Sequence, residues 1–186
     1  MRKFSKFLLV IFIISAVGCS LRKPDLVIMC KDNKTSVEQV QTAIKQGADV
    51  NARSDDGVTV LMYVAEHIES PEMVAELVKA GADINALNRD LSALQLAAMH
   101  SRSPEVITAL ADAGADVNAR TKDGRTVLML AAKNNPNPKI IMALLKAGAD
   151  PTIKDSKGLS TFEHAKGNKG LADTDAYWKL NDALFK

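Results

Sequence analysis

The sequence is poor in aromatic and cysteine residues. Phe, Tyr and Trp make up 4% of its 186 residues, and between positions 25 and 161 the single aromatic residue is Tyr63. Proteins that bind single-stranded nucleic acid without sequence preference stack bases on aromatic side chains, and most of this chain has none. The two cysteines, Cys19 and Cys30, are too few for a disulfide framework. The fold must therefore be stabilised by its apolar core.

The charge balance also argues against a nucleic-acid partner. The sequence holds 24 Lys and Arg against 22 Asp and Glu, a formal net charge of +2. Three of the basic residues lie in the first 18 positions, which contain no acidic residue, so the rest has 21 basic against 22 acidic residues, about −1. Nucleic-acid-binding domains normally present a strongly basic face. We expect no nucleic acid among the partners.

An export signal is predicted at residues 1–18. Arg2, Lys3 and Lys6 precede an apolar run at residues 7–17 that only Ser15 interrupts. This run is shorter than the roughly 20 apolar residues that a membrane-spanning helix needs. The pattern is typical of a cleaved signal rather than of an anchor helix.

The residues after this run, Ala16-Val17-Gly18-Cys19, resemble the lipobox of bacterial lipoproteins. The resemblance implies cleavage before Cys19, acylation of Cys19 and a short linker within residues 19–24. Several acyl chains, at about 0.8 kcal/mol per buried methylene, would hold the protein on a membrane. Ser20, in place of Asp, favours the outer membrane in the Gram-negative sorting rule.

A second interpretation of this site stays open. The first lipobox position prefers Leu and here holds Ala16, and Ala16 with Gly18 also fits an ordinary small-x-small cleavage site. That cleavage would release a soluble periplasmic or secreted protein. A free Cys19 could then pair with Cys30 in an oxidising compartment.

The rest of the chain is an internal repeat. Gly-Ala-Asp occurs four times, at Gly47, Gly81, Gly114 and Gly148, with intervals of 34, 33 and 34 residues. A fixed period of this size indicates a solenoid, in which each unit packs only on its neighbours. Each of these glycines is expected to end a helix in the left-handed conformation that glycine adopts most easily.

Each unit predicts a turn followed by two helices. Asp-Gly pairs at residues 56–57 and 123–124 indicate tight turns with both residues at positive φ. The second unit lacks the turn glycine, so its turn is expected to be blunter. The predicted N-caps of the inner helices are Thr59, Ser92, Thr126 and Ser160, and those of the outer helices, each before a proline, are Ser70, Ser103 and Asn137.

The motifs TVLM at residues 59–62 and 126–129 and SALQ at residues 92–95 resemble the Thr-Pro-Leu-His signature of ankyrin repeats. The resemblance covers residues 25–186. It implies an all-α ankyrin-repeat solenoid of helix-turn-helix units with β-hairpin fingers, about four to five repeats including caps. The expected division is a capping helix pair at residues 25–46, repeats at 47–80, 81–113 and 114–147, and a last repeat with its cap at 148–186.

A closing outer helix is predicted from Thr174 to Phe185. Its apolar residues, among them Tyr177, Trp178 and Leu180, are expected to cover the end of the stack. Cys30 occupies a position where the other repeats have a small residue, and we expect it to be buried.

In ankyrin-repeat proteins, partners usually bind a concave face formed by finger tips and the exposed ends of inner helices. This face is acid-rich in the first full repeat and basic in the third, so it would orient an electrostatically polar partner. The alternative is that these residues are solvated turns without a partner. The candidate contacts are Arg53, Asp55, Asp56, Val58, Glu66 and His67 in the first full repeat, Leu87, Arg89, Asp90, Met99 and His100 in the second, and Arg120, Lys122, Asp123, Arg125, Lys133 and Asn134 in the third.

Two sets of polar residues recur at the same position of successive repeats, and they are the candidates for a metal or catalytic site. His67 and His100 share one repeat position with Asn134 and Asn168. Neighbouring repeats stack roughly 8–10 Å apart, too far for side chains at equivalent positions to ligate one zinc ion. The second set consists of Asp56, Asp90 and Asp123. Their role in forming the turns explains them better than a catalytic pair of carboxylates does.

The sequence has no Gly-rich phosphate loop, zinc-spaced Cys/His cluster or nucleophile elbow. We therefore expect no catalytic residue, metal or cofactor, and a monomer that binds another protein. The leading hypothesis is an envelope lipoprotein that serves as a scaffold or as an inhibitor of a toxic or degradative enzyme. The alternatives are an enzyme or ligand carrier that uses the groove, and a structural tether.

Overall fold

The computed structural model describes residues 23–32 and 34–183. The predicted export signal, Cys19 and the last residues of the predicted closing helix lie outside the described residues. All statements on the fold concern the described part of the chain.

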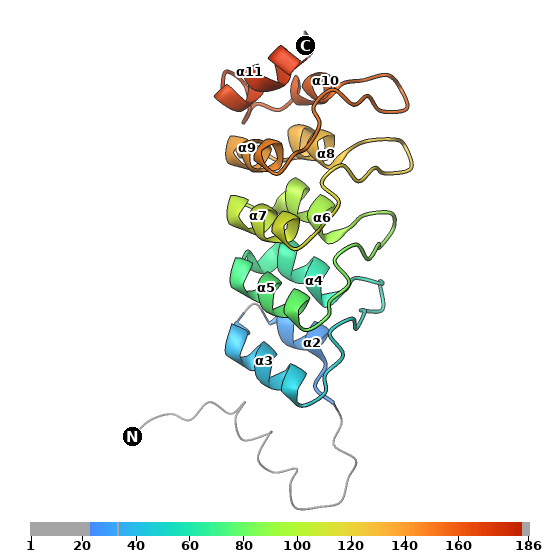
Figure 1. The fold of residues 1–186 in the computed structure, drawn as a ribbon, viewed down its shortest axis with the longest axis vertical. Helices are drawn as coiled ribbons and strands as arrows, with labels where there is room; N and C mark the ends of the chain where they lie inside the picture. The colour runs from blue at the N-terminus through green and yellow to red at the C-terminus, as the bar shows by residue number, and fades with distance from the viewer. Residues whose placement is uncertain (1–22, 33, 184–186) are drawn as a thin grey trace, which may run out of the picture.

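Ten α-helices and one π-helical segment form two columns (Figure 1). In each repeat the inner helix comes first and the outer helix follows it. The inner column contains α2 (Leu26–Lys31), α4 (Val60–Tyr63) with its π-helical continuation η2 (Val64–Ile68), α6 (Ala93–His100), α8 (Val127–Asn134) and α10 (Thr161–Ala165). The outer column contains α3 (Val37–Lys45), α5 (Pro71–Lys79), α7 (Pro104–Asp112), α9 (Pro138–Lys146) and α11 (Asp175–Asp182).

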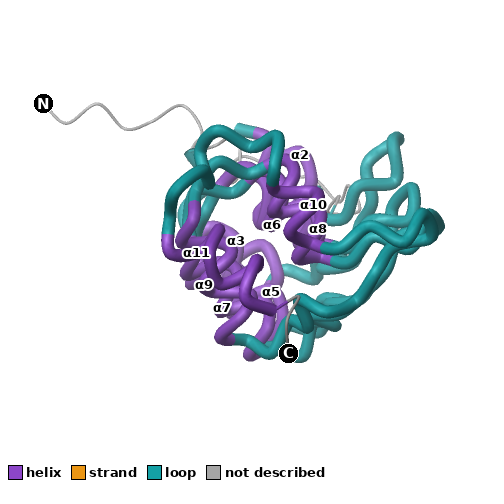
Figure 2. Tube along the Cα trace, turned by 90° about the horizontal axis from the view of Figure 1, so that it is seen from above, coloured by secondary structure: helices purple, strands orange, loops and turns teal. Residues whose placement is uncertain are grey.

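Each helix packs on the helix of the same column in the next repeat. The contacts run from α2 to α4, from α4 and η2 to α6, and from α6 through α8 to α10; in the outer column they run from α3 through α5, α7 and α9 to α11. Seen from above, the two columns lie side by side, and the loops that join one repeat to the next project to one side of them (Figure 2). The expected all-α solenoid of stacked helix pairs is confirmed.

The projecting loops, here called fingers one to four, span residues 53–59, 87–91, 120–126 and 154–159. Within the described residues they form no strand, only isolated antiparallel bridges, such as Arg53 with Thr59 and Arg120 with Thr126. The expected β-hairpins are therefore reduced to single bridge pairs. Their lack of continuous pairing leaves the finger backbone to be held by contacts between repeats.

Fingers one and three turn differently from the expectation. Gly57 and Gly124 adopt φ of 80° and 78°, but the preceding Asp56 and Asp123 do not have positive φ. The prediction that both turn residues are left-handed is wrong here. Each loop is longer than a two-residue hairpin turn, and the amide of Gly57 bonds the carbonyl of Ser54 at 2.8 Å, so one left-handed glycine is enough to close it.

Finger two is shorter than fingers one and three, in line with the blunter turn expected from its missing glycine. Asn88 and Leu91 exchange two backbone hydrogen bonds of 3.0 and 2.9 Å. The two residues between them, Arg89 and Asp90, have φ of 47° and 69°. Such a two-residue turn needs both central residues in the left-handed region, where a non-glycine residue is strained.

The predicted N-caps of the inner helices are confirmed. The hydroxyl of Thr59 accepts a hydrogen bond from the amide of Met62 at 3.2 Å, and Ser92, Thr126 and Ser160 cap their helices in the same way. In the outer column, Ser103 is an exception, because its hydroxyl donates to Glu105 and caps no amide. The pattern of hydroxyl and proline residues thus sets where most helices begin.

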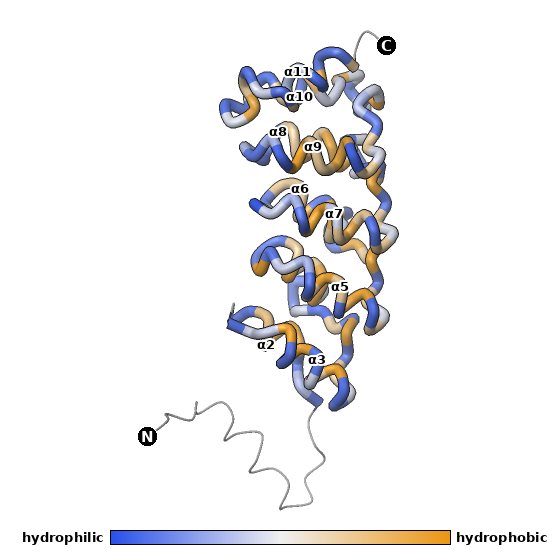
Figure 3. The backbone as a smooth tube through the Cα atoms, turned by 60° about the vertical axis from the view of Figure 1, so that its left-hand side comes forward, coloured by the Kyte–Doolittle hydropathy of each residue, from blue (hydrophilic) through white to orange (hydrophobic). Residues whose placement is uncertain are grey.

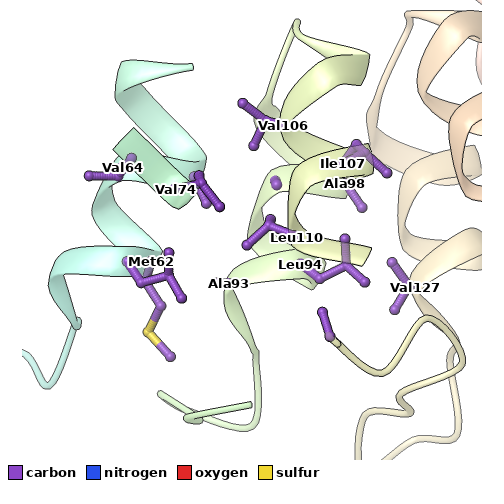
Figure 4. Close-up of a cluster of buried hydrophobic side chains, with 14 of the residues drawn as sticks. Met62, Val64, Val74, Ala93, Leu94, Ala98, Val106, Ile107, Leu110 and Val127 are labelled. Atoms are coloured by element: carbon purple, nitrogen blue, oxygen red, sulfur yellow. The ribbon is translucent and has the colours of Figure 1, made fainter. Parts of the chain in front are cut away.

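The core is a row of apolar layers, one between each pair of repeats (Figure 4). Leu94 and Leu110 from the two helices of one repeat are fully buried, and Val74 and Val127 pack from the repeats on either side. Hydrophobic stretches recur in every layer of the stack (Figure 3). Cys30 is fully buried as expected, and desolvation raises the pKa of its thiol to about 11.

The closing helix does not bury all the residues expected of it. Ala176 and Leu180 of α11 are buried, and the ring of Tyr177 lies 4.8 Å from that of Phe162. Trp178 is 50% exposed, so its predicted role in covering the end of the stack is wrong. Its ring makes a T-shaped contact with the Tyr177 ring, with the two centroids 5.5 Å apart.

Candidate functional site

The predicted contact residues lie on the fingers and on the inner column, and they are together called the finger face here. All of the candidates are exposed or partly exposed, and none is buried: Arg53, Asp55, Asp56, Val58, Glu66, His67, Leu87, Arg89, Asp90, Met99, His100, Arg120, Lys122, Asp123, Arg125, Lys133 and Asn134.

Two of the candidate arginines also bind neighbouring fingers together. Nη1 of Arg53 donates to the carbonyl of Gly57 at 3.0 Å and to the carbonyl of Leu87, in the next finger, at 3.1 Å. Nη2 of Arg120 donates to the carbonyl of Lys154 at 3.0 Å. Their guanidinium groups therefore stabilise the fingers, a role that the sequence analysis did not anticipate.

Several finger charges neutralise each other. Nζ of Lys122 lies 2.7 Å from Oδ2 of Asp90, across two fingers. Within finger three, Arg125 pairs with Asp123 at 2.6 Å. The hydrogen bond from Arg125, helped by one from Thr121, lowers the pKa of Asp123 to about 2. Exposed pairs of this kind contribute little to stability, but they reduce the charge that a partner meets.

On the inner helices, one carboxylate lies between two imidazoles. Glu66 is 3.9 Å from Nδ1 of His67 and 3.9 Å from Nε2 of His100, distances longer than a hydrogen bond. The ring of Tyr63 stacks on that of His67, with centroids 4.5 Å apart. Among residues 23–32 and 34–183, no group of three or more His, Cys, Asp or Glu residues is placed to hold a metal ion.

The asparagine column has a different register from the predicted one. Nδ2 of Asn135 donates to the carbonyls of Ala98 and Ser101 at 3.1 and 2.8 Å. Nδ2 of Asn168 makes the same pair of bonds one repeat later, to Ala132 and Asn135, at 2.9 and 2.7 Å. Asn168 therefore corresponds to Asn135 and not to Asn134, because the segment from the helix N-cap to the asparagine is one residue shorter: eight residues from Ser160 to Asn168 against nine from Thr126 to Asn135.

The sequence analysis missed finger four. Asp155 is buried there, and its Oδ1 accepts the amides of Lys157 and Leu159 at 2.9 Å each. Its Oδ2 lies 2.9 Å from Nε2 of His164 in α10. The 34-residue period that relates Gly124 to Gly158 could have identified this finger.

Two hollows lie away from the predicted residues. One, of about 540 Å³, is lined by residues of the outer helices, among them Met142, Lys146 and Lys179. The other, of about 450 Å³, lies beside it and shares Lys179. Both are open and shallow, and their linings contain no nucleophile paired with a base.

None of the described helices has the length and apolar character that crossing a membrane requires. A family model for ankyrin repeats, in three copies, matches residues 26–121 and 69–155. No curated protein matches the chain.

Proposed function

Because this chain belongs to the ankyrin-repeat family, whose repeats form protein–protein interaction modules, we propose that it binds a periplasmic or envelope protein through its finger face. We propose further that it is an envelope lipoprotein, held on the membrane through Cys19. Modules of this family are typically interaction scaffolds without catalytic activity.

The observation that carries the binding proposal is the pre-ordered finger face. Arg53 fixes finger one to finger two, and Arg120 fixes finger three to finger four. Apolar and adaptable side chains nevertheless stay exposed on this face. Leu87 is 55% exposed at the start of finger two, and Met99 is partly exposed on α6. A surface that is already rigid loses less conformational entropy on binding, and exposed apolar side chains on it supply contact area.

The anchor proposal is supported by the sequence before the described residues. The apolar run, the small residues and Cys19 follow one another in the order found in lipoprotein precursors. Acyl chains on Cys19 would leave only residues 20–24 between the membrane and the stack, at most about 18 Å of extended chain. The partner would then be a protein close to the membrane surface.

The binding proposal can be tested by photo-crosslinking in cells. A photoreactive amino acid replaces Leu87 on the finger face, and a matched variant carries it at Ala75, which is exposed on α5 in the outer column. We expect a discrete crosslinked protein from position 87 and none from position 75. Crosslinks from position 75 alone would place the partner on the other side of the stack and refute the proposal.

Whether the protein acts as an inhibitor or as a scaffold is then decided with the crosslinked partner. The partner's own activity is measured with and without the mature ankyrin domain. Inhibition that the Leu87→Asp variant no longer produces would establish the immunity role. Full partner activity in the complex would establish a scaffold.

The anchor is tested with Cys19→Ser. We expect the wild-type protein to incorporate labelled palmitate and to enter the detergent phase, and the variant to do neither. Cys30→Ser serves as the control, because Cys30 is buried in the stack and its loss should leave labelling unchanged. Equal detergent partitioning of the Cys19→Ser variant and the wild type would refute the lipid anchor and favour a soluble periplasmic or secreted protein.

A further inference from the structure

One end of the finger face carries four lysines that form no ion pair, one of which, Lys166, has its Nζ 5.4 Å from the centre of the Phe162 ring. Lys133, Lys154, Lys157 and Lys166, here called the lysine face, are all exposed. In the part of the chain that the structure describes, none of the four makes an ion pair. They stand apart from Lys122 in finger three, whose charge Asp90 balances at 2.7 Å.

The four lysines come from two neighbouring repeats. Lys154 and Lys157 lie in finger four. Lys133 precedes Asn135 by two residues, and Lys166 precedes Asn168 by two residues. Lys133 lies in the last turn of α8 and Lys166 directly follows α10, so both stand at the C-terminal ends of adjacent inner helices.

The carboxylates of finger four and α10, Asp155 and Glu163, are committed to the fold. Asp155 is buried and bound by two amides and His164. Glu163 accepts the amide of Ser160 at 2.7 Å and its hydroxyl at 2.9 Å. These two hydrogen bonds lower the pKa of Glu163, and the nearby charges of Lys166 and Lys154 lower it further. One carboxylate thus lies among the lysines, and the group keeps a net positive charge.

Finger four is also held rigidly. Its backbone accepts a hydrogen bond from Arg120 at the Lys154 carbonyl, and the amide of Ser156 donates to the carbonyl of Asp123 at 3.1 Å. The contact between Asp155 and His164 ties the same finger to α10. The lysines therefore stand on a surface that is fixed before a partner arrives, which reduces the entropic cost of binding.

The opposite end of the finger face has the opposite charge. Asp55 and Asp56 are exposed at finger one, and neither forms an ion pair or side-chain hydrogen bond within the described chain. Fingers one and four are three repeats apart, roughly 30 Å at a helix spacing of about 10 Å. The face is therefore polarised along its length, and this polarity would give a charged partner a single orientation.

We propose that the lysine face binds an acidic polypeptide segment of the protein partner, with an apolar residue of that segment against Leu159. This inference rests on the proposed function and names the chemistry of the partner. Leu159 is 36% exposed and follows Lys157 by two residues, so the surface pairs positive charge with an apolar contact.

A protein segment fits this surface better than a nucleic acid or an anionic membrane. A long, uniformly negative strand that followed the finger face would meet Asp55 and Asp56 at its other end. The chain after residue 18 has 21 basic against 22 acidic residues, which gives a polyanion no general attraction. An acidic segment of limited length avoids both obstacles.

The first test uses a defined probe. A fluorescein-labelled Glu-rich peptide with interspersed Leu is titrated with the mature protein, and its anisotropy is measured at low and at physiological salt. We expect saturable binding that weakens as salt rises. The double variant K154E/K157E should bind the peptide roughly tenfold more weakly, since each reversed exposed charge removes a modest attraction.

Two controls separate this effect from non-specific charge. K139E/K146E reverses two exposed lysines of α9, in the outer column, and should bind the peptide as the wild type does. A Lys-rich peptide should not bind the lysine face. Equal loss of binding in the two double variants, or tighter binding to duplex RNA or to anionic phospholipid vesicles than to the acidic peptide, would overturn the proposal.

The crosslinked partner separates this inference from the proposed function. If position 87 captures a protein and K154E/K157E abolishes that capture, the proposed function and the acidic-segment proposal are both supported. If capture persists undiminished in K154E/K157E, the acidic-segment proposal fails and the proposed function survives. If only the outer column captures a protein, the proposed function itself fails.

Discussion

Nε2 of His164 lies 2.9 Å from Oδ2 of Asp155, and this contact joins finger four to helix α10. The other carboxylate oxygen accepts the amides of Lys157 and Leu159. The side chain of Asp155 is 4% exposed, so one carboxylate closes the turn and locks it onto the inner helix. No other finger of the described chain has such a buried carboxylate.

The Asp155 carboxylate should make the free energy of unfolding of the domain depend on pH in the acidic range. Burial raises the pKa of Asp155, but the hydrogen bonds from Leu159, His164 and Lys157 outweigh it, and the pKa lies below the ordinary 3.8. Since the unfolded state binds the proton more tightly, the stabilisation is complete above that ordinary value and is lost as the pH falls through the folded-state pKa.

The variant that tests this is Asp155→Asn. We expect a lower melting temperature at neutral pH and a shallower decline in unfolding free energy between about pH 5 and pH 2 than in the wild type. Urea unfolding at a series of pH values measures both. Asp182→Asn, at an exposed residue, is the control; if the two variants had the same acid profile, Asp155 would not be the coupled group.

Gly170 packs directly on the preceding repeat. A Cβ atom at this position would lie 2.4 Å from Cβ and 2.5 Å from the carbonyl oxygen of Pro136. We expect Gly170→Ala to destabilise the last repeat by about 1–3 kcal/mol, because the backbone must move to relieve the overlap. Gly167→Ala is the control, since a Cβ there meets nothing within 4 Å. Chemical denaturation that finds the two variants equally stable would contradict this contact.

Asn135 links two repeats through its buried side chain. Its Nδ2 is the hydrogen-bond donor to the carbonyls of Ala98 and Ser101, 37 and 34 residues earlier. Asn135→Ala leaves these bonds unmade and should cost about 1–3 kcal/mol. The neighbouring Asn134 is exposed and bonds only Leu130 in its own helix, so Asn134→Ala should have a much smaller effect. Urea unfolding of both variants provides the comparison, and similar losses would show that the bond between repeats contributes nothing.

The closing helix α11 should depend on Leu180 more than on Trp178. Leu180 is buried, so Leu180→Ala should cost about 2–5 kcal/mol through the cavity that it leaves. Trp178 is half-exposed and keeps only a T-shaped contact with Tyr177, so Trp178→Ala should cost less. Thermal unfolding followed by circular dichroism ranks the two, and a larger loss for the Trp178 variant would contradict the exposed position of its ring.

The sequence by itself determined the repeat. Three signals mark it: glycines at a period of 33 or 34 residues, hydroxyl residues before the inner helices and prolines after the outer N-caps. Each of them affects the backbone only within a few residues, so it can be recognised in the sequence. The shorter finger two followed from its missing turn glycine for the same reason. The candidate finger face was also predictable, because its residues are those that the repeat pattern leaves unused.

Only the tertiary structure decided which of these residues are free. Arg53 and Arg120 meet their acceptors 34 residues later, and the Asp90 carboxylate meets Lys122 in the next finger. These distances depend on how one repeat sits on the next, which no local pattern contains. The alignment of Asn168 with Asn135 and the exposure of Trp178 likewise depend on packing between elements that are distant in the sequence.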